Sequence, residues 1–362
     1  MSIEMELKKA GIEVTNELDT LTVNRISQNV AKKIISRFPN FGIDEHEIFV
    51  KLSRLNMYKA KMPEGIAEAN YFYKNCSIYF NNHIADEDLE EFAIHECLHY
   101  LQEIKDSKNN LLKMGLCTYS SSRPHGLGLN EAAVQYLASK IIGIKPDYEK
   151  YYGINLYTPS PSYYPLECAL LGELLYFIDE DILFRSTFFS TDEFKNAIIR
   201  NASFETFSKL EKLFDLILKL EEKIVLLNNK IFSTDEKSSS IEKLNRKIKK
   251  YKEKMTSTFI ETQNLIITSF FDKGFSQIND LETLENYRRK LYKFSDIIGS
   301  SQNYKFFDNY YALTMNKLEH KCNILENGGI ETAVSNNSSN LFFSFLYKFK
   351  KLFGHKDNET EL

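Results

Sequence analysis

One short segment of the sequence carries residue types that could bind a metal ion and activate water. His95, Glu96 and His99 form the pattern His-Glu-x-x-His within residues 92–103, a run that reads as helical. Because residues four apart share one face of a helix, His95 and His99 can direct two imidazole nitrogens at one point, as a zinc ion requires. The carboxylate of Glu96 can take a proton from a metal-bound water and return it to a leaving group. The pattern predicts metal-assisted hydrolysis; the plainer interpretation is two ordinary histidines on a helix.

A second helical run, further along the chain, predicts the third ligand. The chain breaks at Gly126 and Gly128 and then resumes a helical pattern, with Glu131 in its first turn. Two histidines and one glutamate leave a fourth zinc position open to water, which separates a catalytic zinc site from a structural one. His125 is the alternative third ligand. We rank it below Glu131 because a ligand on a rigid helix is better positioned than one beside two glycines.

These segments resemble the gluzincin superfamily of zinc metallopeptidases, the thermolysin-like clan, in which a His-Glu-x-x-His helix is followed by a second helix that donates a glutamate, often as Asn-Glu. The resemblance covers residues 66–180 and rests on five residues, His95, Glu96, His99, Asn130 and Glu131. It implies an α+β zincin-like catalytic domain, with a small mixed sheet and metal-binding helices. It also implies Zn2+ as cofactor, a peptide or protein substrate, and Glu96 as general base.

The chain departs from the thermolysin pattern four residues after the ligand glutamate. Thermolysin-like enzymes often place an aspartate there to hydrogen-bond a ligand histidine, whereas this chain has Gln135. An amide oxygen can accept the same bond but lacks the negative charge that raises the basicity of the imidazole. We therefore expect Gln135 and Asn130 beside the ligands. The spacing from His99 to Glu131 is longer than in thermolysin, and we expect the intervening residues 106–124 to form the rim of the active site.

The stretch between the two metal helices contains the candidates for stabilising an oxyanion. Residues 116–126 are polar, rich in turn formers and poor in helix formers, so we expect a loop. Tyr119, Arg123 and His125 could each donate a hydrogen bond to the oxyanion of a scissile carbonyl. Each of the three also has a plain alternative as a surface residue.

A helix and then strands are expected before the metal helix, and Lys74-Asn75 could turn a hairpin within the second strand run. Residues 21–38 have apolar side chains at helical spacing. Residues 47–58 and 70–80 are rich in aromatic and branched side chains, which favour strands. The resemblance implies that residues 67–72 or 77–80 bind a substrate peptide by strand addition, and the alternative is an ordinary edge hairpin.

Three further segments are expected to complete the first domain, which we place at residues 1–200. Residues 151–165 form a tyrosine-dense stretch with three prolines, expected as a loop that lines a substrate cleft or covers the core. An apolar helix over residues 166–184 and a short helix over residues 191–201 follow.

An all-α helical domain is expected over residues 205–325. Two heptad seams, at residues 213–231 and 241–255, are separated by the polar residues 233–240. Two seams joined by a short polar break predict an antiparallel helical hairpin. Two more helices are expected, over residues 281–298 and 304–325.

The C-terminal residues differ in character from both domains. A linker rich in Ser and Asn is expected over residues 326–340, followed by a basic amphipathic helix over residues 341–355. Such a helix can make peripheral contact with a membrane interface, or it can dock in a groove of its own protein.

The composition narrows the class of protein. The net charge of −4 gives no electrostatic reason for a nucleic-acid partner, and five scattered cysteines fit reduced thiols. The absence of an eighteen-residue apolar run and of a signal-peptide core predicts a cytoplasmic protein. Taken together, the sequence predicts a cytoplasmic zinc metallopeptidase. The alternative is a noncatalytic, metallopeptidase-like binding or scaffold protein that acts through its helical domain and tail.

Overall fold

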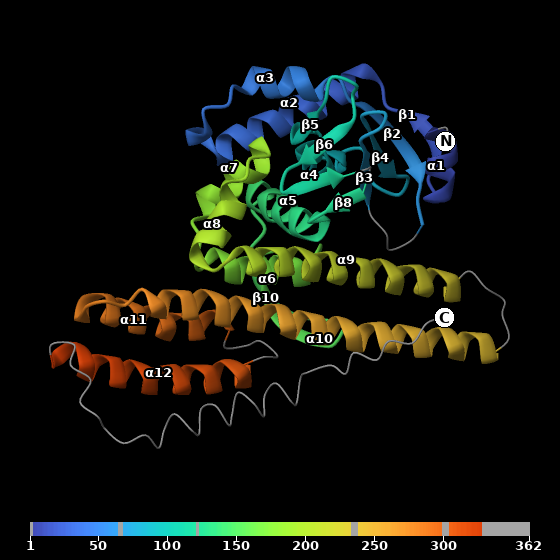
Figure 1. Ribbon diagram of the computed structural model, residues 1–362. Coiled ribbons are helices and arrows are strands. Elements are labelled where there is room, and N and C mark those ends of the chain that lie inside the picture. The colour runs from blue at the N-terminus through green and yellow to red at the C-terminus, as the bar shows by residue number, and fades with distance from the viewer. Residues whose placement is uncertain (1–2, 64–67, 121–122, 233–237, 299–303, 328–362) are drawn as a thin grey trace.

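The computed structural model describes residues 3–63, 68–120, 123–232, 238–298 and 304–327. These residues fold into a mixed α+β structure, with small sheets in the N-terminal part and long helices in the C-terminal part (Figure 1). Every helix among them is too short or too polar to cross a bilayer. The predicted tail helix at 341–355 lies outside the described residues, as does the predicted linker beyond Asn327.

The N-terminal part builds a four-stranded sheet and the helix that carries His95 and His99. Its elements, in chain order, are α1 (Ile3–Lys9), β1 (Glu13–Glu17), α2 (Thr20–Arg37), a 3-10 turn (Pro39–Phe41), α3 (Glu45–Leu52), β2 (Asn56–Lys61), β3 (Ala69–Phe72), β4 (Ser77–Asn81) and α4 (Leu89–Leu101). The strand order is β1-β2-β4-β3, with β2 and β4 parallel and the other pairs antiparallel. β3 is an edge strand, whereas β4 is paired on both sides. Strand addition along residues 77–80 is therefore wrong, because their backbone groups are already bonded.

A helix replaces the first half of the strand expected over residues 47–58. The carboxylate of Asp44 accepts a hydrogen bond from the N–H of Glu47 at 3.0 Å and so caps α3. Ile48 and Leu52, four residues apart, are both buried. The branched residues that resemble a strand form one face of this short helix.

Residues 116–126, expected as a loop, lie largely in a second, antiparallel sheet. Its strands, in order across the sheet, are β5 (Glu103–Lys105), β6 (Leu111–Met114), β7 (Cys117–Ser120) and β8 (Arg123–His125). The chain turns between β6 and β7 at Gly115, where φ is +58° and a Cβ would lie 2.1 Å from Oδ1 of Asn130. The same oxygen accepts a hydrogen bond from the N–H of Leu116 at 2.8 Å. The expectation of a loop is wrong because a residue of a later helix secures this turn.

Two expectations between the second metal helix and residue 201 are also wrong in part. The elements are α5 (Leu127–Ile142), β9 (Asp147–Tyr151), β10 (Ile154–Thr158), α6 (Pro165–Leu175), α7 (Glu180–Phe189) and α8 (Glu193–Asn201). The first half of the tyrosine-dense stretch belongs to the β9–β10 hairpin, not to a loop. The helix expected over residues 166–184 is two helices, because Asp179 caps α7 by accepting a hydrogen bond from the N–H of Asp181 at 2.8 Å.

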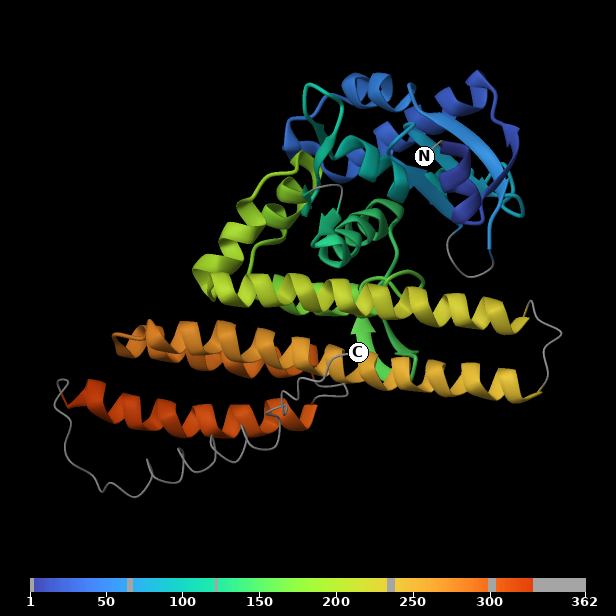
Figure 2. The ribbon, with the colours of Figure 1, turned by 45° about the vertical axis from the view of Figure 1, so that its right-hand side comes forward.

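The C-terminal part is all helical in the residues described. It contains α9 (Phe204–Phe232), α10 (Ser238–Ser276), α11 (Leu281–Ile298) and α12 (Tyr304–Glu326). α9 and α10 run side by side in opposite directions, as the two heptad seams predict (Figure 2). The bounds of α11 and α12 agree with the two further helices expected there.

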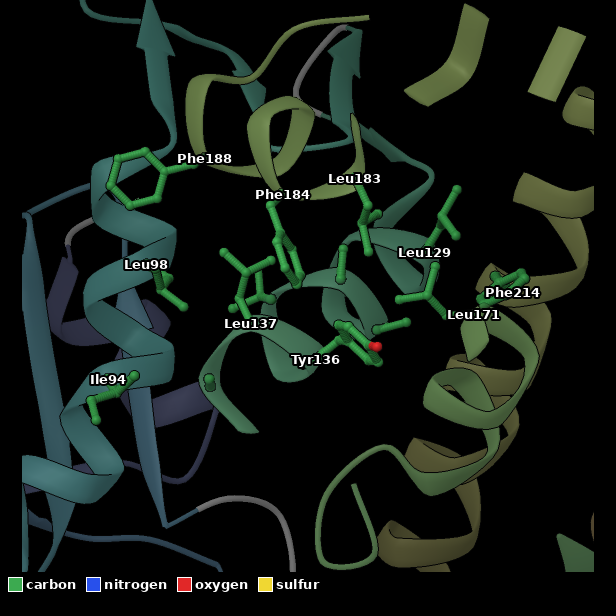
Figure 3. Close-up of a cluster of buried hydrophobic side chains, with 14 of the residues drawn as sticks. Ile94, Leu98, Leu129, Tyr136, Leu137, Leu171, Leu183, Phe184, Phe188 and Phe214 are labelled. Atoms are coloured by element: carbon green, nitrogen blue, oxygen red, sulfur yellow. The ribbon is translucent and has the colours of Figure 1, made fainter. Parts of the chain in front are cut away.

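One hydrophobic cluster joins the N-terminal part to the first helices of the C-terminal part. It includes buried side chains of α2, α4, α5 and α6, and also of α9 and α10, among them Leu98, Leu137 and Phe214 (Figure 3). A Cβ at Gly128 would lie 2.4 Å from the carbonyl oxygen of Phe214, so α5 and α9 approach with no room for a side chain. A second cluster joins α10, α11 and α12. The boundary expected near residue 200 falls between α8 and α9, but the main core continues across it.

Candidate metal centre

α4 and α5 bring the three predicted ligands together. Nε2 of His95 lies 3.0 Å from Nε2 of His99 and 3.3 Å from Oε2 of Glu131, and the latter two atoms are 3.4 Å apart. Neighbouring ligand atoms in a tetrahedral zinc site with bonds of about 2.0–2.1 Å are about 3.3 Å apart. In the part of the chain that the structure describes, these residues form the one group of three metal-ligating side chains close enough to share an ion. Both the chemistry and the spacing of the donors fit zinc.

Apolar packing holds the two ligand helices in place. Ile94 and Leu98, each next to a candidate ligand in the sequence, are fully buried, and Leu98 points from α4 towards α5 (Figure 3). On α5, Ala132 and Val134 are also fully buried. Because both helices are packed in the core, the ligand side chains start from rigid backbone.

A residue of the C-terminal part caps the second ligand helix. The carboxylate of Asp215, on α9, accepts hydrogen bonds from the N–H groups of Gly126 at 3.1 Å and Gly128 at 2.8 Å. These N–H groups belong to the start of α5, where no partner exists within the helix. α9 therefore helps to set the position of Glu131, one turn further along α5.

The charged groups of the centre stabilise one another. Burial disfavours ionisation of Glu131, but the neighbouring His99 and His95 outweigh burial and lower the pKa of its carboxyl far below the usual range. Burial would lower the pKa of His95, but its hydrogen bond to Glu131 and the negative charge of Glu96 raise it. Glu131 is thus kept in the ionised form that binds metal.

Gln135 lies beside the first ligand, as predicted. Its Oε1 is 2.9 Å from Nδ1 of His95, while its Nε2 donates to the hydroxyl of Ser160 at 3.0 Å and to that of Ser139 at 3.3 Å. The side-chain oxygen of Asn130, which we also expected beside the ligands, instead holds the turn between β6 and β7.

Glu96 faces the edge strand of the first sheet. Its side chain is largely buried, and its Oε2 accepts a hydrogen bond from the N–H of Tyr71, in β3, at 2.6 Å. This bond joins the Glu96 carboxylate to the edge strand, and the negative charge of Glu96 acts on the neighbouring His95.

The three predicted oxyanion donors lie in different surroundings. Arg123 and His125 are exposed on β8, and His125 lines a cavity of about 260 Å³ beside α8 and α9. Tyr119 is partly buried, with its ring 6.0 Å from that of Tyr73. Burial and nearby groups that include Glu131 raise the pKa of the Tyr119 phenol. Tyr119 therefore lies within electrostatic reach of Glu131.

Tyr164, which the sequence did not single out, lies directly against the first ligand. Its ring stacks on that of His95, with the centroids 5.8 Å apart and 19° between the planes. Burial and the negative charges of Glu131 and Glu96 raise the pKa of its phenol, so its hydroxyl stays protonated and can donate. Its φ of +49°, directly before Pro165, is a strained conformation of the kind found at functional sites. The density of tyrosines in this stretch was the one sequence signal that pointed here.

Behind the centre, α6 and α9 bury a pair of carboxyl groups. Glu167 is fully buried and Glu221 nearly so. Burial raises the pKa of both groups, and the charge of Glu167 raises that of Glu221 further. The pair therefore retains a proton where isolated glutamates would lose theirs.

The centre thus combines three candidate ligands, a carboxylate and a partly buried tyrosine, a set of groups suited to activating water at a metal ion. Comparisons of the chain with protein-family models, with curated proteins and with solved structures found no match.

Proposed function

We propose that this protein is a zinc-dependent metallopeptidase with a zincin-like α+β catalytic part. The observation that carries the proposal is the spacing of 3.0–3.4 Å among the nitrogens of His95 and His99 and the Glu131 oxygen, with Glu96 adjacent. A bound zinc ion would polarise the peptide carbonyl and lower the pKa of its water to about 7. The runner-up is a noncatalytic binding or scaffold protein of the same fold.

Two side chains take the proton-transfer and oxyanion roles in this proposal. Glu96 receives the proton of the attacking water and passes it to the leaving amine, with its other oxygen held by the N–H of Tyr71. The protonated hydroxyl of Tyr164 is the preferred donor to the oxyanion, since its ring lies against His95. Tyr119 is the next candidate.

The outer edge of β3 is where we place the substrate backbone. The N–H of Tyr71 points to Glu96 rather than to β4, so the backbone groups of Ala69, two residues earlier, face the same way. Successive residues of a strand alternate in the direction of their backbone groups. Accordingly, the carbonyl of Glu68 faces β4 and accepts a hydrogen bond from the N–H of Asn81 at 2.8 Å. A peptide paired with this edge would lie alongside the ligands.

Zinc content and peptide cleavage test the proposal together. We expect the purified protein to bind zinc stoichiometrically and to cleave members of a peptide library, with products identified by mass spectrometry. Glu96→Gln should retain zinc but lower turnover by about 10²–10⁴-fold. Glu91→Gln, an exposed position on the same helix, is the matched control and should behave as the parent.

Two outcomes would contradict parts of the proposal. Cleavage by Glu96→Gln at the parent's rate would overturn the assigned base. A parent protein that binds no zinc, or that binds zinc and cleaves no peptide, would favour the noncatalytic binding or scaffold protein.

A further inference from the structure

We propose that Ser160 is a positioning residue for the metal centre, which sets the orientation of the Gln135 amide and through it the tautomer of His95. Ser160 lies in the segment between β10 and α6, and its hydroxyl donates to the carbonyl oxygen of Tyr163. The inference deepens the proposed function and rests on it, since it concerns the same zinc site.

The direction of the hydrogen bonds is determined first at a backbone carbonyl. The oxygen of Tyr163 can only accept, and it lies 2.7 Å from Oγ of Ser160, so the serine proton must point at it. The lone pairs of Oγ are then left to accept. Nε2 of Gln135, at 3.0 Å, donates to one of them.

The orientation of the amide then decides where the imidazole carries its proton. With Nε2 directed at Ser160, Oε1 of Gln135 faces Nδ1 of His95 at 2.9 Å. An amide oxygen accepts and does not donate, so Nδ1 must carry the hydrogen. In a neutral imidazole this leaves the lone pair on Nε2, the atom that faces Glu131 and the second ligand.

Burial makes this chain of bonds hard to replace. Ser160 is fully buried and Gln135 is 4% exposed, so bulk water cannot substitute for the serine hydroxyl. Without that hydroxyl, the amide can rotate and present its NH2 group to Nδ1 of His95. The rotated amide favours the tautomer with its hydrogen on Nε2, which cannot bind the metal.

A second serine provides the matched control. Oγ of Ser139 lies 3.3 Å from the same Nε2 of Gln135, also in a buried position. For Ser139 the structure gives no bond from its hydroxyl to a backbone carbonyl of the kind that orients Ser160. Removal of the Ser139 hydroxyl takes away one acceptor, but Ser160 still holds the Gln135 amide in its orientation.

The experiment measures zinc affinity by competition with a chelator in five variants, after circular dichroism has verified folding. We expect Ser160→Ala to weaken zinc binding by about 10–100-fold and Ser139→Ala by less than about 3-fold. In a Gln135→Glu background the side chain has no NH2 group to present, so adding Ser160→Ala should change affinity by less than about 3-fold. Ser160→Cys replaces Ser160→Ala if the alanine variant does not fold. Cysteine is closer to serine in size but forms only weak hydrogen bonds, so Ser160→Cys should also bind zinc more weakly than the parent.

The inference is overturned if Ser160→Ala binds zinc as tightly as the parent. It is also overturned if the loss is equally large in the Gln135→Glu background, because Ser160 would then merely support the packing of its segment. A parent that binds no zinc at all overturns the proposed function itself, and is recognised before any variant is measured.

Discussion

The candidate metal centre and the junction of α6 with α9 and α10 bury acidic side chains with opposite results. At the centre, Glu131 lies among imidazoles, and its pKa is lowered despite burial. At the junction, burial raises the pKa of Glu167, Glu173 and Glu221. The comparison teaches that burial alone does not decide the charge of a carboxyl group. Groups of opposite charge must converge on it, and they do so where α4 meets α5.

The largest effect is expected from removal of the negative charge of Glu131. Glu131→Gln should lower zinc affinity by more than about 100-fold and abolish cleavage, because it removes the negative ligand and leaves two imidazoles. Chelator competition measures the affinity, with Glu91→Gln as control. Zinc binding equal to that of the parent would show that another donor completes the site.

The link between the two regions can be tested at the contact of α5 with α9. Gly128→Ala should lower the free energy of unfolding by about 1–3 kcal/mol, since the new Cβ would lie 2.4 Å from the carbonyl oxygen of Phe214. Gly172→Ala is the matched control, because a Cβ at that helical glycine has no atom within 4 Å. Urea denaturation should show Gly172→Ala to be neutral or slightly stabilised. Equal losses in both variants would contradict the importance of this contact.

A smaller effect is expected from the cap that α9 provides for α5. Asp215→Ala should cost about 1–2 kcal/mol of stability, because two N–H groups at the start of α5 lose their acceptor. Asp215→Asn keeps one acceptor oxygen and should lose less. If the two variants were equally stable, the hydrogen bonds would not be the cause.

Stability at the junction should also depend on pH. Glu173 accepts a hydrogen bond from Gln263 of α10, and burial raises the pKa of its carboxyl to about 8. An unfolded glutamate has a pKa of about 4.3, so the folded protein binds more protons between these values. The contribution of Glu173 to stability is therefore fully present below about pH 4 and falls as the pH rises towards 8.

Glu173→Gln removes this titration. Relative to the variant, the parent should lose stability between pH 5 and about pH 8.5, as thermal unfolding at several pH values would show. Glu253→Gln, exposed on α10, is the control and should follow the parent. Parallel pH profiles for the parent and Glu173→Gln would mean that this carboxyl is not kept neutral.

Local signals in the sequence were enough to place the ligand residues on helices. His95 and His99 share a helix face because of their spacing, and Glu131 follows a glycine break in a helical run. The seams of α9 and α10 and the bounds of α11 also follow from periodicity. Each of these properties depends on residues within a few turns of one another.

Contacts between residues far apart in the sequence determine the other features of the site. The turn before β7 depends on Asn130, the start of α5 depends on Asp215, and the stacking of Tyr164 on His95 joins α6 to α4. None of these contacts leaves a periodic or compositional trace near the residues it organises. The sequence by itself therefore determined which residues could bind a metal ion. Only the tertiary structure decided how they are oriented, because hydrogen bonds and close contacts between distant segments select one arrangement of the helices.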